Sequence, residues 1–188
     1  MELDPRADLS VILRAVHDGS EEAKDRLVRA IYAELRRIAA RLMRRERTDH
    51  TLQPSALVHE VLIRLLDGDA LADVPNQNYL FSAAARAMRQ VLVDHARRRD
   101  AGKRAGKRVR LPLDEALAQF DAQGLDVIDL HEALDRLAGT HARAAQVVDL
   151  RFFGGLSIPE VARTLGLSES SVESDWRFAR AWLRGQLA

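Results

Sequence analysis

Two short patterns are the first candidates for catalytic chemistry. His59-Glu60 and His131-Glu132 each begin like the zinc-protease signature His-Glu-x-x-His, in which two histidines four residues apart bind the metal. The second histidine is missing from both, because Ile63 and Asp135 stand in those positions. The chain also lacks a glycine-rich phosphate loop and any spacing that pairs a nucleophile with a base. We therefore predict that the chain is not an enzyme and has no catalytic site, metal site or cofactor.

Basic side chains in the middle of the chain are the stronger candidate for a functional site. The net charge is only +1, but residues 86–110 are strongly basic and an acidic run, Asp114 to Asp129, follows them. Clustered cations of this kind neutralise nucleic-acid phosphates. We expect the acidic run to fold back toward the basic surface when DNA is absent. The basic and amide residues assigned here to DNA binding are Arg86, Arg89, Gln90, Arg97, Arg98, Arg99, Lys103 and Arg104.

Amide and aromatic residues precede this basic cluster. Asn76, Gln77, Asn78 and Tyr79 follow one another at the end of a predicted loop. Such side chains can stack on a base that has left the double helix and can form hydrogen bonds with its edges. These four residues therefore suit a base that has left the duplex, and they are assigned here to DNA binding.

The C-terminal part contains the pattern of a helix-turn-helix. Ser157 and Glu160 form a predicted capping box, Gly166 ends the first helix, and Ser168 can cap a second helix. Two short amphipathic helices with this spacing read duplex DNA in many regulators, and an ordinary helical hairpin is the structural alternative. The DNA contacts predicted for the second helix are Ser168, Ser170, Ser171, Ser174, Arg177 and Arg180.

Helices must position all of these side chains. Apolar residues recur at intervals of three and four along the chain, and no convincing strand pattern is present. The predicted helices cover Leu9–His17, a long segment capped by Ser20, a segment opened by Pro54, a segment from Tyr79 to Arg99, Ile128–Leu137 and Ala142–Phe152. We predict an all-α fold with two helical domains, residues 8–100 and 128–187. A linker at residues 101–127 joins them, and the second domain carries the helix-turn-helix.

The composition excludes several other classes of protein. Among the 188 residues there is no cysteine, which excludes disulfides, thiolate metal sites and thiol catalysis. The sequence has no apolar run long enough to cross a bilayer, and residues 1–10 lack the layout of a signal peptide. We expect a cytoplasmic protein with no membrane partner.

Several strings occur in the order found in extracytoplasmic-function sigma factors of bacterial RNA polymerase, and the chain resembles that family over nearly its whole length. The string LVHEVLIRL at residues 57–65 resembles the part of the second conserved region that binds the polymerase clamp. Residues 79–99 resemble the parts that melt and read the −10 element. Residues 147–153 with the helix-turn-helix resemble the domain that reads the −35 element. The string DWRFARAWL at residues 175–183 is similar to one subfamily whose genes often accompany Ser/Thr protein kinases.

The resemblance implies a function and a set of partners. It implies that the chain directs the core of bacterial RNA polymerase to promoter DNA and helps to open it, with a Ser/Thr protein kinase as a further partner. A free-standing helix-turn-helix regulator, which binds duplex DNA without polymerase, is the alternative function. The polymerase contacts that the resemblance implies are Gln53, Ser55, Val58, His59, Glu60 and Ile63.

The start of the clamp-binding helix departs from the family pattern. Relatives commonly carry acidic residues there, whereas this chain has Gln53-Pro54-Ser55-Ala56. A phosphate on Ser55 would add ~1.5–2 negative charges at neutral pH. We therefore predict that Ser55 is a regulatory phosphorylation site, and a simple helix-capping role for this serine is the alternative.

The recognition helix departs from the pattern as well. Many relatives carry basic groups near the positions of Glu173 and Asp175, which are acidic here. Either this helix binds DNA weakly, or Arg177, Arg180 and Arg184 hold the DNA backbone in place of those groups.

Overall fold

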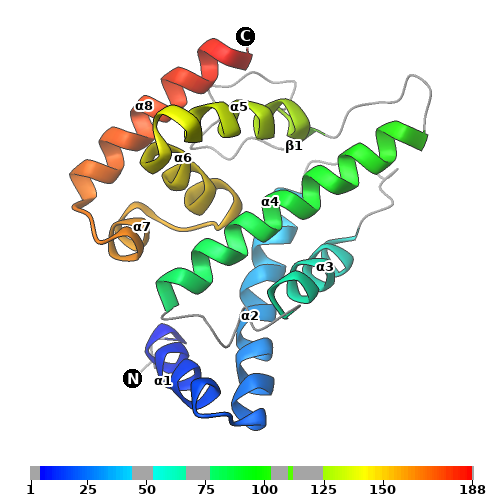
Figure 1. Ribbon diagram of the computed structural model, residues 1–188, viewed down its shortest axis with the longest axis vertical. Helices are drawn as coiled ribbons and strands as arrows, with labels where there is room; N and C mark the ends of the chain where they lie inside the picture. The colour runs from blue at the N-terminus through cyan, green and yellow to red at the C-terminus, as the bar shows by residue number, and fades with distance from the viewer. Residues whose placement is uncertain (1–4, 44–52, 67–76, 103–109, 112–124, 188) are drawn as a thin grey trace.

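The computed structural model describes residues 5–43, 53–66, 77–102, 110–111 and 125–187, and these residues are almost entirely helical (Figure 1). The all-α prediction is therefore confirmed. Three of the predicted DNA-binding residues, Asn76, Lys103 and Arg104, lie outside the described residues, as does most of the acidic run that begins at Asp114.

The N-terminal half consists of four helices: α1 (Pro5–His17), α2 (Glu21–Leu42), α3 (Pro54–Leu66) and α4 (Gln77–Gly102). Ser20 caps α2 as predicted, because its hydroxyl accepts a hydrogen bond of 3.2 Å from the backbone nitrogen of Ala23. The apolar stripe of α2, which includes Leu27, Ile31 and Leu35, is buried against the neighbouring helices. The two longest helices of this half are α2 and α4, and both contact the C-terminal half.

The C-terminal half consists of α5 (Val127–Thr140), α6 (Ala142–Val148), the π-helix η1 (Asp149–Phe153), α7 (Ile158–Leu165) and α8 (Glu169–Leu187). Ahead of α5, β1 (Arg110–Leu111) pairs with β2 (Leu125–Asp126) in an antiparallel two-residue ladder. Both ends of α7 follow the sequence prediction. The capping box of Ser157 and Glu160 is formed, and Gly166 ends the helix in the left-handed conformation with φ +66.

Three local predictions need correction. The helix expected over Ala142–Phe152 changes to π geometry at Asp149, a local widening of the helix that is frequent at functional positions. Strand pairing, which the periodicity did not predict, is present in the ladder of β1 and β2. Helix α4 begins at Gln77, so Gln77 and Asn78 belong to its first turn and not to a preceding loop.

Helix α4 lies at the centre of the molecule. In Figure 1 it runs diagonally between the N-terminal helices and the C-terminal half, and it packs against η1, α5 and α7 as well as against α3. Buried residues of both halves form one continuous hydrophobic core. We call the contact region between the two halves the seam.

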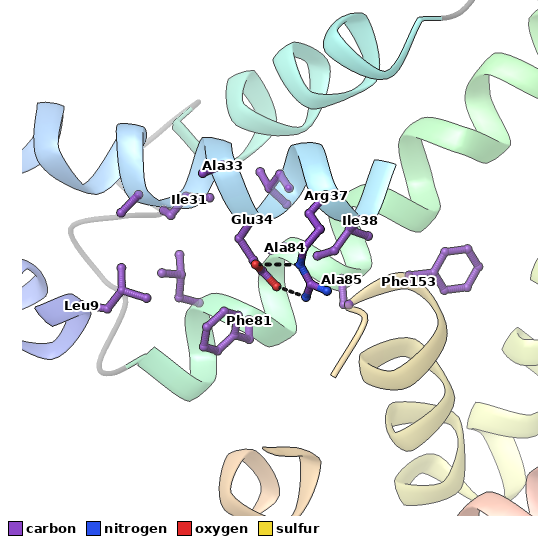
Figure 2. A pocket seen from close by; sticks show the side chains of 14 residues that line it. Leu9, Ile31, Ala33, Glu34, Arg37, Ile38, Phe81, Ala84, Ala85 and Phe153 are labelled. Atoms are coloured by element: carbon purple, nitrogen blue, oxygen red, sulfur yellow. Dashed lines mark hydrogen bonds and ion pairs between the residues drawn. The ribbon is translucent and has the colours of Figure 1, made fainter. Parts of the chain in front are cut away.

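A cavity of about 620 Å³ opens along the seam. Helices α1, α2 and α4 form most of its wall (Figure 2), and Phe153 and Gly154 line it from the C-terminal half. An ion pair between Arg37 and Glu34, with 2.6 Å between Nη2 and Oε1, lies on the α2 side. The cavity therefore lies mainly within the N-terminal half and borders the C-terminal half at Phe153 and Gly154.

Candidate nucleic-acid interface

The basic face of α4 is only partly open to solvent. Arg86, Arg97 and Arg98 are exposed, whereas Arg99 is half-buried. Arg98 is close to α3, since its Nη2 donates to Oε2 of Glu60 at 3.1 Å. One predicted DNA-binding residue is thus paired with one predicted polymerase-binding residue.

The amide side chain of Gln90 is held within α4. Its Nε2 donates to Oδ1 of Asp94 at 3.0 Å, and Asp94 also accepts from Arg64 of α3. The hydrogen bond from Arg64 is the main reason why the pKa of Asp94 lies below its usual value. Asp94 therefore stays charged and keeps Gln90 in place beside the exposed arginines.

Arg89 is the exception on this face, because only 15% of its side chain is exposed. It turns toward the C-terminal half, where its Nη2 donates to Oδ1 of Asp135 at 3.0 Å and its Nη1 lies 3.5 Å from Oδ1 of Asp149. His131 approaches the same carboxylate, with 3.5 Å between its Nε2 and Oδ2 of Asp135. The structure therefore places this predicted DNA-binding arginine in an internal charge cluster.

Asp149 is the most perturbed acid among the described residues with a resolved shift. Burial raises its pKa to about 6, against the opposing attraction of Arg89 and Arg86. Its Oδ1 has no hydrogen-bond partner among the described residues, and the arginine at 3.5 Å is an ion-pair neighbour only. Burial also lowers the pKa of His131, so the imidazole tends to be neutral there. Burial in this part of the seam therefore disfavours the charged forms of both Asp149 and His131.

The first turn of α4 carries the remaining amide and aromatic candidates. Tyr79 is exposed, and Gln77 and Asn78 are half-buried. The side-chain Nδ2 of Asn78 donates to the backbone oxygen of Arg163 in α7 at 3.2 Å. Asn78, like Arg89, is thus engaged with the C-terminal half.

The turn between α7 and α8 groups the predicted serines. The Ser168 hydroxyl accepts from the backbone nitrogen of Ser171 at 3.2 Å, which confirms the predicted cap. It also lies 3.0 Å from the hydroxyl of Ser170 and 2.8 Å from that of Ser171. Ser174 and Arg177 are exposed further along α8, and Arg180 is half-buried.

Helix α8 carries three acidic residues, Glu169, Glu173 and Asp175, and one of them is paired inside the molecule. Arg143 of α6 donates to both carboxylate oxygens of Asp175, at 2.6 and 3.1 Å. The same contact raises the pKa of the Arg143 guanidinium above its ordinary value. Glu173 remains exposed. The sequence analysis did not anticipate the role of Arg143, because the pair joins positions 32 residues apart.

The predicted polymerase-binding residues lie along α3 but differ in exposure. Ile63 is 56% exposed, and His59 is also on the surface, where its ring lies 5.8 Å from that of Tyr32. Gln53 is exposed just ahead of the helix, and Ser55 is half-buried in its first turn. Val58 is completely buried, so it supports the packing of α3 and offers no contact surface.

The described residues contain no group of three or more metal-ligating side chains and no helix that meets the length and hydropathy of a membrane span. Asp135 and Asp149 are the additional residues of this interface; the sequence analysis named Asp135 only in the place of a missing metal-binding histidine and did not name Asp149. A signal for Asp149 was available, since it is a carboxylate between the apolar residues Val147, Val148 and Leu150.

Comparison with known proteins adds the family. The searches of curated proteins and of solved structures give no match. The model of the family described as "ECF sigma factor" matches residues 6–188. Proteins of this family are transcription regulators without catalytic activity that act with the RNA polymerase core on promoter DNA. Because the match covers nearly the whole chain, the protein belongs to the ECF sigma factor family and is an RNA polymerase sigma factor of transcription initiation.

Proposed function

We propose that this sigma factor contacts promoter DNA through α4 and the α7–α8 pair, binds the polymerase core through α3, and is activated by phosphorylation of Ser55. Residues 8–100 and 128–187 are then its two functional domains, connected by residues 101–127. The match to the ECF sigma factor family carries the general role. The finer assignments rest on the surfaces described above.

The exposed arginines of α4 support the assignment of the −10 contacts. Arg86, Arg97 and Arg98 form a cationic track along one helix, and Tyr79 presents an aromatic ring at its N-terminal end. A track of this kind neutralises phosphates, and the ring can stack on a base released from the duplex. The arrangement fits a protein that holds one strand of an opened promoter.

The beginning of α8 supports the assignment of the −35 contacts. The N-terminal residues of a recognition helix are those that meet base edges in the major groove. Ser170 and Ser174 are exposed there, and Arg177 follows as a backbone contact. Arg143 already binds Asp175, so the exposed carboxylates that still oppose an approaching phosphate in this helix are Glu169 and Glu173.

The first turn of α3 carries the proposal of a phosphorylation switch. This turn contains no acidic residue, and Ser55 is its second residue. A phosphate there would lie at the positive end of the helix dipole and could form one to three new charge-assisted hydrogen bonds with a basic partner. The similarity of residues 175–183 to a kinase-associated subfamily supports the same idea. Exposed Ile63 and His59 on α3 would complete the contact surface.

Co-purification with core polymerase, followed by transcription from a pool of promoter fragments, tests the general role. Association and promoter-dependent transcripts are expected. A chain that binds duplex DNA but never joins polymerase would instead be a free-standing regulator.

The switch is tested by comparing the unmodified protein, the protein with phosphoserine incorporated at position 55, and Ser55→Ala. We expect the phosphorylated form to bind polymerase about tenfold more tightly, which corresponds to ~1.4 kcal/mol. Gln53→Glu is the matched variant, since it adds a carboxylate at the same end of α3 without a phosphate. Equal affinity of the unmodified and phosphorylated forms would rule out the switch and leave the sigma role intact.

A further inference from the structure

We propose that the face of α4 around Arg89 is an interaction surface with two alternative partners: the protein's own C-terminal half in the free state, and a nucleic-acid backbone in the bound state. In the free state the carboxylate of Asp135 stands where a phosphate would stand. This inference rests on the proposed function only in assigning nucleic acid to α4.

Arg89 is the central residue of this surface, because its guanidinium cannot bind both partners at once. Its two terminal nitrogens face Asp135 and Asp149, and little of the side chain reaches solvent. A guanidinium forms equivalent hydrogen bonds with carboxylate and with phosphate oxygens. Nucleic acid can therefore use Arg89 only if the carboxylates move away, and the exchange replaces one anion by another.

Two more contacts across the seam have the same character. Asn78 donates its side-chain amide to the backbone oxygen of Arg163, and Arg41 of α2 donates to the backbone oxygen of Phe152 at 2.6 Å. The donor of Asn78 is the group proposed to bind a base edge. Thus a second predicted DNA-binding side chain is already hydrogen-bonded to a backbone oxygen of the C-terminal half.

The covering elements also block access. Helices α5 and α7 and the π-helix η1 pack directly on α4, and Figure 1 shows them along one side of it. Gly155 brings the chain so close to α2 that an added Cβ would lie 3.2 Å from the side chains of Ile38 and Arg41. Nucleic acid reaches this face only after the seam has opened.

The remaining arginines make the exchange possible. Arg86, Arg97 and Arg98 stay exposed beside the seam, so a nucleic-acid strand can bind them before the seam opens. Phosphates bound by these arginines then lie close to Arg89 and compete with Asp135 for its guanidinium. The side chain of Asp135 is 55% exposed, so it can be displaced. The closed and open forms thus differ in their affinity for polyanions, which is the requirement for a population shift.

The experiment measures seam opening and nucleic-acid affinity on the same full-length variants. The chain has no cysteine, so spin labels can be placed at Ala40→Cys in α2 and Ala181→Cys in α8, two exposed positions on either side of the seam. Double electron–electron resonance then reports the distance between the halves. Asp135→Arg removes the carboxylate and places a cation next to Arg89. Asp135→Asn is the milder second variant if the first fails to fold.

Asp25→Arg in α2 is the control, since it makes the same charge change at an exposed position outside the seam. We expect Asp135→Arg to lengthen the distance between the labels and to bind a fluorescent 20-nucleotide oligo(dT) about three- to tenfold more tightly than Asp25→Arg, the range expected for the net contribution of one hydrogen bond. Adding oligo(dT) to the wild-type protein should lengthen the same distance.

The proposal is overturned if the distance in Asp135→Arg equals that of the wild type, or if its affinity for oligo(dT) equals that of Asp25→Arg. Transcription with core polymerase is measured in parallel. Failure of every variant to initiate would refute the proposed sigma activity of the purified chain, whereas the distances would still decide whether the seam opens.

Discussion

Asp149 places its carboxylate in the seam, where burial raises its pKa to about 6 from an ordinary value of 3.8. The groups that face it are Arg89 and Arg86 from α4 and Asp135 from α5. Because the folded protein binds this proton more tightly than the unfolded chain does, the contribution of Asp149 to stability is complete below about pH 4. It is lost as the pH rises through about 6.

We therefore predict that Asp149→Asn stabilises the protein at pH 8 and has little effect near pH 4. The neutral amide removes the cost of burying a charge, and each pKa unit corresponds to about 1.4 kcal/mol, so the gain at pH 8 reaches ~3 kcal/mol at most. Urea unfolding at a series of pH values measures it. Asp25→Asn, at an exposed site, is the control. A constant difference between Asp149→Asn and the wild type across the pH range would contradict the role of burial.

Gly155 is the second residue with a seam-specific role. Its φ of +69 is in the left-handed region, and an added Cβ would meet Ile38 and Arg41 at 3.2 Å. Gly166 has almost the same φ, +66, but nothing lies within 4 Å of its added Cβ. A comparison of substitutions at the two glycines therefore separates the cost of left-handed backbone from the cost of the close contact with α2.

Gly166→Ala should lower the free energy of unfolding by about 1–2 kcal/mol, the cost of left-handed backbone for an L-residue. Gly155→Ala should cost more than that, because it also pushes η1 and α2 apart. Thermal or urea unfolding of both variants measures the difference. Equal costs would indicate that the seam adapts to the extra methyl group without penalty.

At the scale of elements, α4 combines two surfaces that behave differently. Arg97 and Arg98 near its C-terminal end are exposed to solvent, whereas Arg89 near its middle is held by the C-terminal half. We predict that replacing Arg97, Arg98 and Arg99 together by Ala lowers the salt dependence of DNA binding by about one unit of slope for each lost phosphate contact.

The matched triple variant removes the same charge from α2: Arg26→Ala, Arg29→Ala and Arg36→Ala, all at exposed positions. Binding of a promoter fragment is titrated at several salt concentrations. The α2 variant should retain the wild-type slope. If both variants lower the slope equally, α4 has no special place in DNA binding and only the net charge matters.

The elements also indicate which features a sequence can predict. The bounds of α2 and α7 follow from Ser20, Ser157, Glu160 and Gly166, because capping is decided within one helical turn. The partners of Arg89 lie 46 and 60 residues further along the chain, and helical periodicity carries no information about which helices meet. For the same reason the hydrogen bond from Asn78 to the backbone of Arg163 in α7 could not be predicted, and the start of α4 at Gln77 was missed as well.

At the scale of the whole molecule, the shared core predicts cooperative unfolding. Both tryptophans, Trp176 and Trp182, lie in α8, so their fluorescence reports the C-terminal half alone, whereas far-ultraviolet circular dichroism reports all helices. We predict coincident urea transitions for the wild type, the expected result when two halves unfold together. Asp135→Arg, which weakens the seam, should separate the two transitions. Separate transitions in the wild type would show that the halves are thermodynamically independent.

The continuous core across the seam has a further consequence for the heat of binding. Association that buries apolar surface lowers the heat capacity, which is the usual signature of complex formation. Here the seam must open first, and apolar groups near it, such as Phe153, become hydrated, which raises the heat capacity. The two terms oppose each other. Isothermal titration calorimetry at several temperatures should therefore give a heat-capacity change for the wild type that is less negative than that of a seam-opened variant with the same DNA.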